Sequence, residues 1–232
     1  MTDNSHPLQQ RLNTVIGRID AAIARFSREP DSVTLLAVSK TRSADELRTI
    51  AAEGITRFGE NYLQEALDKM AELADLSLEW HFIGPIQSNK TRSIAEHFNW
   101  VHSVDRWKIA RRLSDQRPDG LPPLNVCLQV NIDREPQKAG VAPEQAAELA
   151  RQCVELSGIR LRGLMCIPLP PSEDHDPASS YERMLTLFTE LKSAGLNLDT
   201  LSMGMSADLE SAIMHGSTMV RVGTDLFGPR PE

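Results

Sequence analysis

Cysteine is scarce in this sequence, and its placement excludes two kinds of protein. Only Cys127, Cys153 and Cys166 are present, widely spaced and each within an apolar segment. No pair of them has the spacing of metal ligands, and three isolated cysteines do not make a disulfide framework. We therefore expect three buried free thiols in a reducing cytoplasm and no metal site.

Long apolar runs and an excess of positive charge are missing as well. No run is long enough to cross a bilayer, and the start, MTDNSHPLQQRLNTVIGRID, lacks the apolar core of a secretory signal. The basic residues are scattered and outnumbered by acidic ones, which gives a net charge of −7. We expect a cytoplasmic protein that binds neither membrane nor nucleic acid. A small anion can still bind where local dipoles converge.

What the sequence does contain is a regular alternation of strands and helices. Eight short apolar segments predict strands at 34–40, 56–61, 79–84, 99–104, 124–131, 161–167, 200–205 and 218–224. Helical patterns separate them; the first begins with a capping box at Ser43 and Glu46 and ends at Gly54. Eight such repeats favour a closed parallel (β/α)8 TIM barrel. The alternative, an open doubly wound sheet, would need a glycine-rich turn after its first strand, and SKTRSAD has no glycine.

This barrel accounts for nearly the whole chain, so we predict one domain over residues 1–232. An amphipathic helix is expected at about 7–27 and the barrel at about 33–228. Only DLFGPRPE follows the last strand, too short for an eighth outer helix, so the N-terminal helix is expected to fill that gap. We expect no C-terminal β-domain, and a mobile loop at 168–180.

Barrels of this kind carry their sites at the carboxyl-terminal ends of the strands. The loops after the seventh and eighth strands, GMSAD and VGTD, form the usual phosphate site of the fold. Ser206 is expected to cap the helix that follows it. Gly223 would let the backbone approach a ligand closely, and Thr224 offers a hydroxyl.

Two positively charged residues, Lys40 and Arg221, are expected to lie near this phosphate site. Lys40 ends the first strand on the face of Leu36 and Val38, where apolar surroundings and a nearby cation lower a lysine pKa and make it a nucleophile toward an aldehyde. Arg221 interrupts the apolar strand TMVRVGT on the face of Gly223. A nucleophilic lysine beside a phosphate site is what pyridoxal 5′-phosphate (PLP) requires, and an arginine facing the pyridine nitrogen is a known partner of that cofactor.

Other interpretations of these residues stay open. Lys90 and Lys138 are alternative nucleophiles, although each lies in a polar loop. Arg221 could instead form an internal salt bridge, for which Glu60 is the candidate partner.

Six longer segments resemble the pyridoxal phosphate homeostasis protein family. They are LLAVSKT, FGENYLQEA, WHFIGPIQSNK, RGLMCI, LSMGMSADLESAI and GSTMVRVGTDLFG, and the resemblance runs from about residue 8 to about residue 230. Those proteins are similar to the barrel domain of bacterial alanine racemases. The cofactor-binding positions that the resemblance implies are Lys40, Asn61, His81, Ser206, Arg221, Gly223 and Thr224. Lys40 would be the Schiff-base lysine and Asn61 a contact near the ring; His81 is either a further contact or a hydrogen-bonded core residue.

The resemblance implies a non-enzymatic protein of intracellular PLP homeostasis, which holds PLP on Lys40 and transfers or buffers it. PLP-dependent apo-enzymes would be the acceptors, and we expect a monomer. The alternative is a racemase-like PLP enzyme acting on an amino acid. Racemisation needs a second base on the opposite face of the cofactor, and neither Tyr62 nor Tyr181 is an obvious one. Arg221 cannot accept a proton from the pyridine nitrogen, which weakens the ring as an electron sink, although the racemases also carry arginine there.

Overall fold

The structure, a computed structural model, describes residues 7–170 and 176–229, and its strands close into a parallel barrel. All eight predicted strands are present and pair in chain order, with β8 returning to β1. They are β1 (Thr34–Val38), β2 (Arg57–Glu60), β3 (Glu79–Phe82), β4 (Trp100–Val104), β5 (Leu124–Gln129), β6 (Ile159–Met165), β7 (Thr200–Ser202) and β8 (Met219–Val222). The prediction of a (β/α)8 barrel is confirmed.

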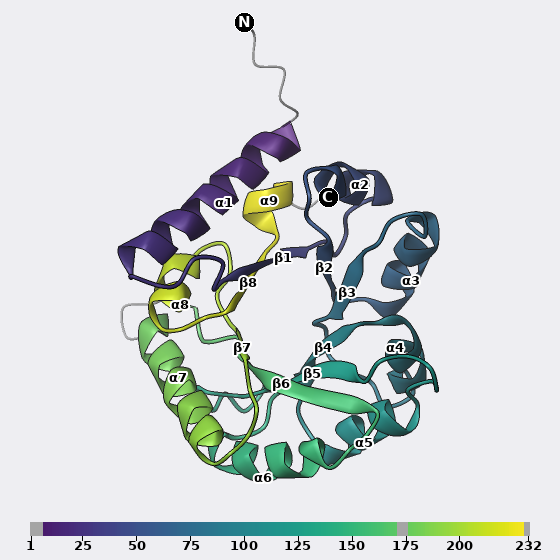
Figure 1. Cartoon of the computed structure of the whole chain (residues 1–232), viewed down its shortest axis with the longest axis vertical. Coiled ribbons are helices and arrows are strands. Elements are labelled where there is room, and N and C mark those ends of the chain that lie inside the picture. Colours follow the sequence, from purple (N-terminus) through teal and green to yellow (C-terminus); the bar gives the residue numbers. More distant parts are fainter. Residues whose placement is uncertain (1–6, 171–175, 230–232) are drawn as a thin grey trace, which may run out of the picture.

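Helices surround the barrel, and the N-terminal one fills the gap in the ring (Figure 1). They are α1 (Pro7–Arg25), α2 (Ala44–Ala52), α3 (Leu63–Glu72), α4 (Thr91–His97), α5 (Trp107–Asp115), α6 (Pro143–Val154), α7 (Pro177–Ser193), α8 (Leu209–Met214) and α9 (Thr224–Phe227). Because α9 is a single turn, α1 packs along α8 and α9 and buries Leu12 and Val15. The expected long loop at 168–180 is shorter, since α7 begins at Pro177, and 171–175 lie outside the described residues.

The predicted start of α2 is correct in detail. The Ser43 hydroxyl accepts a hydrogen bond from the Glu46 backbone N–H at 3.3 Å, and the Glu46 carboxylate accepts one from the Ser43 N–H at 2.9 Å. This reciprocal capping box fixes where the chain turns from the end of β1 into α2.

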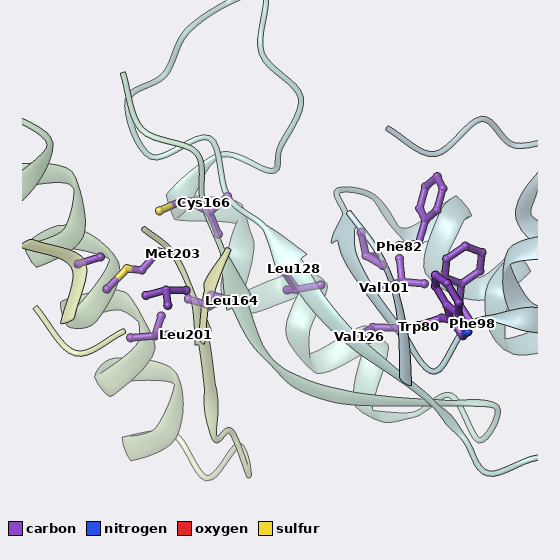
Figure 2. Packing of buried hydrophobic residues seen from close by; sticks show 14 of the residues in the cluster. Trp80, Phe82, Phe98, Val101, Val126, Leu128, Leu164, Cys166, Leu201 and Met203 are labelled. Atoms are coloured by element: carbon purple, nitrogen blue, oxygen red, sulfur yellow. The ribbon is translucent and has the colours of Figure 1, made fainter. Parts of the chain in front are cut away.

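Strand alternation divides the side chains into two layers. Trp80 and Phe82 of β3, with Val101 of β4, belong to the apolar cluster between barrel and helices (Figure 2). Phe98 closes this cluster with an edge-on contact to Phe82 at 5.3 Å between ring centroids. The side chains between these positions point the other way, into the barrel, because successive residues of a strand face opposite sides.

The pairing of β1 with β8 positions the mouth of the barrel. Leu36 lies beside Arg221, and Ala37 lies beside Val222. A Cβ atom at Gly223 would stand 3.2 Å from the Val38 carbonyl oxygen, so the two strand ends approach closely there. The lysine that follows β1 and the loop that follows β8 therefore leave the barrel side by side.

A substitution at Gly163 tests the close packing of β6 against β7. A Cβ atom at this position would lie 1.7 Å from the Thr200 carbonyl oxygen on β7. Gly163→Ala should therefore lower the free energy of unfolding by about 3 kcal/mol or more, because β6 and β7 must separate. The matched control is Gly17→Ala in α1, where no atom lies within 4 Å; better helix propensity should stabilise that variant by about 0.5–1 kcal/mol. Urea unfolding measures both, and a Gly163→Ala variant as stable as the wild type would contradict the packing described.

Candidate functional site

The segment that carries Lys40 is held by a buried ionic cluster. The Lys69 ammonium, on α3, donates to the Ser39 carbonyl at 2.7 Å, to Glu60 at 2.7 Å and to Glu65 at 2.6 Å. Ser39 also donates its hydroxyl to Glu60 at 2.6 Å. The residue after Lys40, Thr41, donates its N–H to Glu65 at 2.5 Å. Both neighbours of Lys40 are thus fixed, and Lys40 itself is half-buried.

This cluster overturns the suggested salt bridge between Glu60 and Arg221. Glu60 is fully buried on the helix side of β2, because it alternates with Gly59, which faces Leu36 inside the barrel. Arg221 is inside the barrel, so the two side chains lie on opposite faces of the sheet. Burial raises the pKa of the Glu60 carboxyl, and the Lys69 ammonium opposes that shift.

The loops after β7 and β8 meet at Ser206. The Ser206 hydroxyl accepts a hydrogen bond from the Asp225 backbone N–H at 3.3 Å, which joins the GMSAD and VGTD segments. Gly223 is half-buried and Thr224 is exposed beside them. Ser206, Gly223 and Thr224 therefore come together as the sequence predicts.

The capping role of Ser206 is wrong. Residues 206–208 form a turn, α8 begins at Leu209 and its N-cap is Asp208. The Asp208 carboxylate holds this turn by accepting from the Met205 N–H at 2.6 Å and from the Tyr181 hydroxyl at 2.7 Å. The Ser206 hydroxyl is consequently directed to the neighbouring loop and not to its own helix.

Arg18 of α1 ties both loops together, and sequence reasoning did not identify it. Its guanidinium donates to the Ser206 carbonyl at 2.9 Å, to Glu210 at 2.7 and 2.8 Å and to Asp225 at 2.5 Å. The pKa of Glu210 is lowered chiefly by its hydrogen bond from Arg18. The only sequence signal is an arginine between the buried positions Val15 and Ile19 of an amphipathic helix.

Arg221 is buried inside the barrel and bound to three acceptors. It donates to the Ser202 carbonyl at 2.6 Å, to the Ser202 hydroxyl at 2.9 Å and to the Cys166 carbonyl at 2.9 Å. Its position on β8, level with Leu36 of β1, places it below Gly223 and the mouth. These three acceptors make a buried guanidinium tolerable without a carboxylate partner.

His81 lies deeper in the barrel than the mouth. Its Nε2 is 3.0 Å from Glu79, and its Nδ1 is 2.9 Å from Nε2 of His102, a residue that sequence reasoning missed. His102 Nδ1 lies 2.9 Å from the Ser202 hydroxyl. Burial lowers the pKa of His81 and holds that of His102 well below its usual range. A hydrogen bond from the His81 ring to a ligand would require one of these contacts to break.

Asn61 and the glycine beside it shape the mouth after β2. The Asn61 Oδ1 atom is buried and has no hydrogen-bond partner among the described residues. A Cβ atom at Gly84 would stand 2.2 Å from the Asn61 carbonyl oxygen, so the two loops are in contact. This buried amide oxygen is therefore available to accept a hydrogen bond from a ligand.

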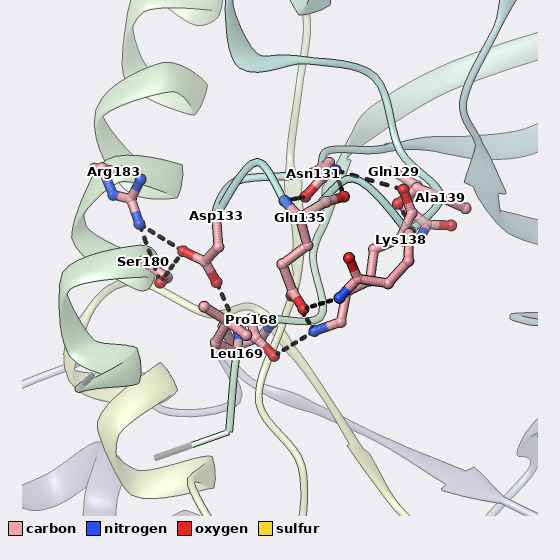
Figure 3. A network of polar contacts seen from close by, with 11 residues as sticks. Gln129, Asn131, Asp133, Glu135, Lys138, Ala139, Pro168, Leu169, Ser180 and Arg183 are labelled. Carbon is pink, nitrogen blue, oxygen red and sulfur yellow. Dashed lines mark hydrogen bonds and ion pairs between the residues drawn. The ribbon is translucent and has the colours of Figure 1, made fainter. Parts of the chain in front are cut away.

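The far side of the mouth is occupied by a polar network (Figure 3). Asp133 accepts from the Leu169 N–H at 2.7 Å and from Arg183 at 2.6 Å. Lys138 is ion-paired with Glu135 and donates to the Pro168 carbonyl at 3.2 Å. Lys138 is thus engaged, whereas the other alternative nucleophile, Lys90, is exposed at the start of α4.

The polar groups at this mouth fit a phosphorylated aromatic aldehyde. It combines a lysine amine, two hydroxyls next to a close-approach glycine, an unpaired amide oxygen and a buried guanidinium below. No group of histidine, cysteine or acidic residues in 7–170 and 176–229 could hold a metal ion. All three cysteines are buried and free as expected, and burial raises the pKa of each to about 12.

Comparisons with known proteins identify the family and the fold of the chain. The family model of the alanine racemase N-terminal domain matches residues 17–231. A pyridoxal phosphate homeostasis protein of Pseudomonas aeruginosa is 58% identical, over 96% of each chain. PipY of Synechococcus elongatus, solved with PLP bound, is 40% identical with a TM-score of 0.80, covering 90% of this chain and all of its own. An alanine racemase of Clostridium difficile shares the fold at 16% identity, with a TM-score of 0.73 over 97% of this chain and 57% of its own.

The buried cluster beneath Lys40 gives a first prediction for this site. Lys69→Met should lower the free energy of unfolding by about 3–5 kcal/mol, because Glu60 would remain buried without its cation. Adding Glu60→Gln should recover much of that loss, which a double-mutant cycle in urea detects. Arg92→Gln, which breaks an ion pair on the surface, is the control and should leave the urea midpoint nearly unchanged. Additive effects of Lys69→Met and Glu60→Gln would rule out the coupling.

The buried histidine pair predicts a pH dependence of stability. In the unfolded chain each histidine titrates near 6.5, whereas burial lowers both pKa values in the fold. On acidification the unfolded chain takes up protons that the folded protein does not, so stability is present above the unfolded pKa and is lost as pH falls. Between about pH 7 and pH 5.5 the loss should reach up to about 1.4 kcal/mol per pH unit for each histidine. The slope should persist when the other four histidines are replaced by glutamine; its disappearance there would show that it arises elsewhere.

Proposed function

The chain belongs to the pyridoxal phosphate homeostasis protein family, and on this premise we propose that it binds PLP at the carboxyl-terminal mouth of the barrel. The relative solved with PLP bound, at 40% identity, supports this assignment of the ligand. When bound, PLP would supply an aldehyde that forms a Schiff base with an amine. The residues around the mouth determine where the aldehyde, the phosphate and the ring would lie.

The observation that carries the proposal is the pairing of β1 with β8. It brings the segment after Val38 level with Gly223 and the phosphate loop. One small molecule can then contact the Lys40 amine and the loop after β8 at once. The ionic cluster on both sides of Lys40 holds its backbone in place for that contact.

The phosphate would be held by neutral donors. The Ser206 and Thr224 hydroxyls and the backbone of these loops are the available groups, and Gly223 permits the approach. Two carboxylates lie next to these loops, Glu210 in the first turn of α8 and Asp225 in α9, and Arg18 binds both of them. The guanidinium therefore offsets negative charge that would otherwise weaken the binding of an anion.

The ring would lie above Arg221, with Asn61 at its edge. A guanidinium only donates, so it cannot hold a proton for the pyridine nitrogen, and the ring is a weaker electron sink than it would be beside a carboxylate. Both ring nitrogens of His81 are already bonded. We therefore place His81 in the interior network below the cofactor, acting on it only through Arg221.

A carrier role fits these residues better than racemisation. Neither tyrosine was an obvious second base from the sequence. In the structure Tyr181 is fully buried and donates its hydroxyl to Asp208, and burial raises its pKa. Tyr62 is 54% exposed. The relatives of high identity are named homeostasis proteins, whereas the alanine racemase is similar at only 16% identity.

Loading the protein with PLP and adding amino acids separates the two functions. Repeated turnover of the amino acid would establish the enzyme. Loss of the cofactor to an added PLP-dependent apo-enzyme, without turnover, is the result that the carrier role predicts.

Transfer requires an accessible mouth. Tyr62, Ile167 and Met205 follow β2, β6 and β7 and are exposed, so apolar side chains are available to an acceptor apo-enzyme there.

No helix among the described residues is long and apolar enough to span a bilayer. We place the protein in the cytoplasm as a single 1–232 domain that acts as a monomer.

Lys40 provides the decisive test of the proposed function. The wild-type protein with PLP should absorb in the visible range as a Schiff base does, and Lys40→Ala should lose that band completely because the nucleophile is gone. Lys90→Ala and Lys138→Ala are the controls and should keep it. Borohydride reduction followed by peptide mapping identifies the modified lysine. Cofactor trapped on Lys90 or Lys138 would disprove the assignment to Lys40.

A further inference from the structure

A chain of hydrogen bonds crosses the barrel from Arg221 to the opposite mouth. The chain runs from Arg221 on β8 to Ser202 on β7, then to His102 on β4, His81 on β3 and Glu79 at the start of β3. Its successive contacts measure 2.9, 2.9, 2.9 and 3.0 Å. Its inner members, Ser202, His102 and His81, are fully buried, and Glu79 is partly exposed at the far end.

The two ends of the chain fix its direction. A guanidinium can only donate, so the Ser202 oxygen accepts from Arg221, and a carboxylate can only accept, so His81 carries its hydrogen on Nε2. A neutral His81 then accepts at Nδ1, which requires a hydrogen on Nε2 of His102. His102 in turn accepts at Nδ1 from the single hydroxyl hydrogen of Ser202. Every link has one donor and one acceptor.

The alternative arrangements are less favourable. A protonated His81 would donate to His102 from Nδ1, His102 would donate to Ser202, and the Ser202 hydrogen would have no acceptor within the chain. It would also place a second positive charge inside the barrel together with Arg221. If both histidines were instead neutral Nδ1–H tautomers, the lone pair of His81 Nε2 would point at the Glu79 carboxylate. The neutral chain is the arrangement that satisfies all of its members.

We propose that His102 and Ser202 are positioning residues for Arg221, and that the chain fixes both histidines as neutral Nε2–H tautomers. His102 holds the Ser202 hydroxyl so that its oxygen lone pair faces the guanidinium. Without that acceptor the hydroxyl rotates, and Arg221 is left with the backbone carbonyls of Ser202 and Cys166. The part of this inference that concerns the cofactor rests on the proposed function, because only bound PLP would feel a displaced guanidinium.

The far end of the chain opens to solvent. Glu79 also binds Arg57 at 3.2 Å, and both line a cavity of about 380 Å³ at the amino-terminal mouth with Arg162 and Asp199. The amino-terminal mouth is therefore connected to the buried Arg221 by a continuous chain of hydrogen bonds through the barrel interior.

The tautomers are measured directly in the cofactor-free protein. Long-range ¹H–¹⁵N correlation spectra at neutral pH should show one protonated nitrogen, Nε2, on each of His81 and His102. An Nδ1–H tautomer or a doubly protonated ring at either position would overturn the chain. Because no PLP is present, this result does not depend on the proposed function, which fails separately if the wild-type protein does not bind PLP.

The positioning role is tested with two replacements of His102. In His102→Asn the side-chain amide oxygen occupies the place of Nδ1 and can still accept from Ser202, whereas His102→Leu cannot. The leucine variant should lose about tenfold or more in PLP affinity, as expected when a charged donor loses a well-placed acceptor, and its cofactor band should shift. The asparagine variant should stay close to the wild type in both.

Two outcomes would overturn the role. Equal losses in the leucine and asparagine variants would indicate packing alone, and wild-type affinity and spectrum in the leucine variant would show that His102 does not act on Arg221. Ser202→Ala removes a single oxygen from the same chain and should reproduce the His102→Leu result. A wild-type result for Ser202→Ala would therefore also contradict the proposal, whether or not His102→Leu folds.

Discussion

The parallel pairing of β1 with β8 is the contact on which the rest of this structure depends. It closes the sheet, and with closure every strand has two neighbours and no edge remains. The same pairing sets Leu36 beside Arg221 and brings Val38 against Gly223. The strands β1 and β8 thereby bring Lys40 and the loop that we propose for the phosphate to the same mouth of the barrel. A slip of one residue in this register would turn Arg221 out of the barrel and separate the two halves of the site.

The interior of the barrel contains a hydrogen-bonded polar network beside apolar side chains. Trp100, Cys127 and Met165 form a small apolar cluster, and His81, His102, Ser202 and Arg221 are buried and bonded to one another. Burying such groups without partners costs several kcal/mol each, so a half-satisfied network would be worse than an apolar filling. The polar network lies just below the proposed position of the cofactor. There it can hold the Arg221 guanidinium in a fixed position toward the ring.

The sequence predicted the eight strands and the helices between them, because these follow from local periodicity. The seven cofactor positions stay a prediction: the structure brings Ser206 to the VGTD segment that holds Gly223 and Thr224, but it places His81 in the interior network. The sequence did not predict contacts that depend on which face of a strand or helix a residue lies on, or on a partner far along the chain. Alternation with Gly59 could have excluded Glu60 as the partner of Arg221. Lys69 could have been found as a lysine on the buried face of α3. The contacts of Arg18 with residues about 190 positions away, and of His102 with Ser202, have no local signal, since they exist only after the barrel has closed.

The contacts that Arg18 of α1 makes with Ser206, Glu210 and Asp225 also determine when this part of the fold can form during synthesis. The helix α1 is synthesised before its partners Ser206, Glu210 and Asp225, which follow Arg18 by 188, 192 and 207 residues. Contacts of such long sequence separation form late, because the entropy of closing a large loop must be overcome before they contribute. A chain that has been made only as far as β6 therefore has Lys40 but lacks the loops that we propose for the phosphate. Because the proposed binding site needs a closed barrel, a bound ligand would add its binding energy to the stability of the closed state alone.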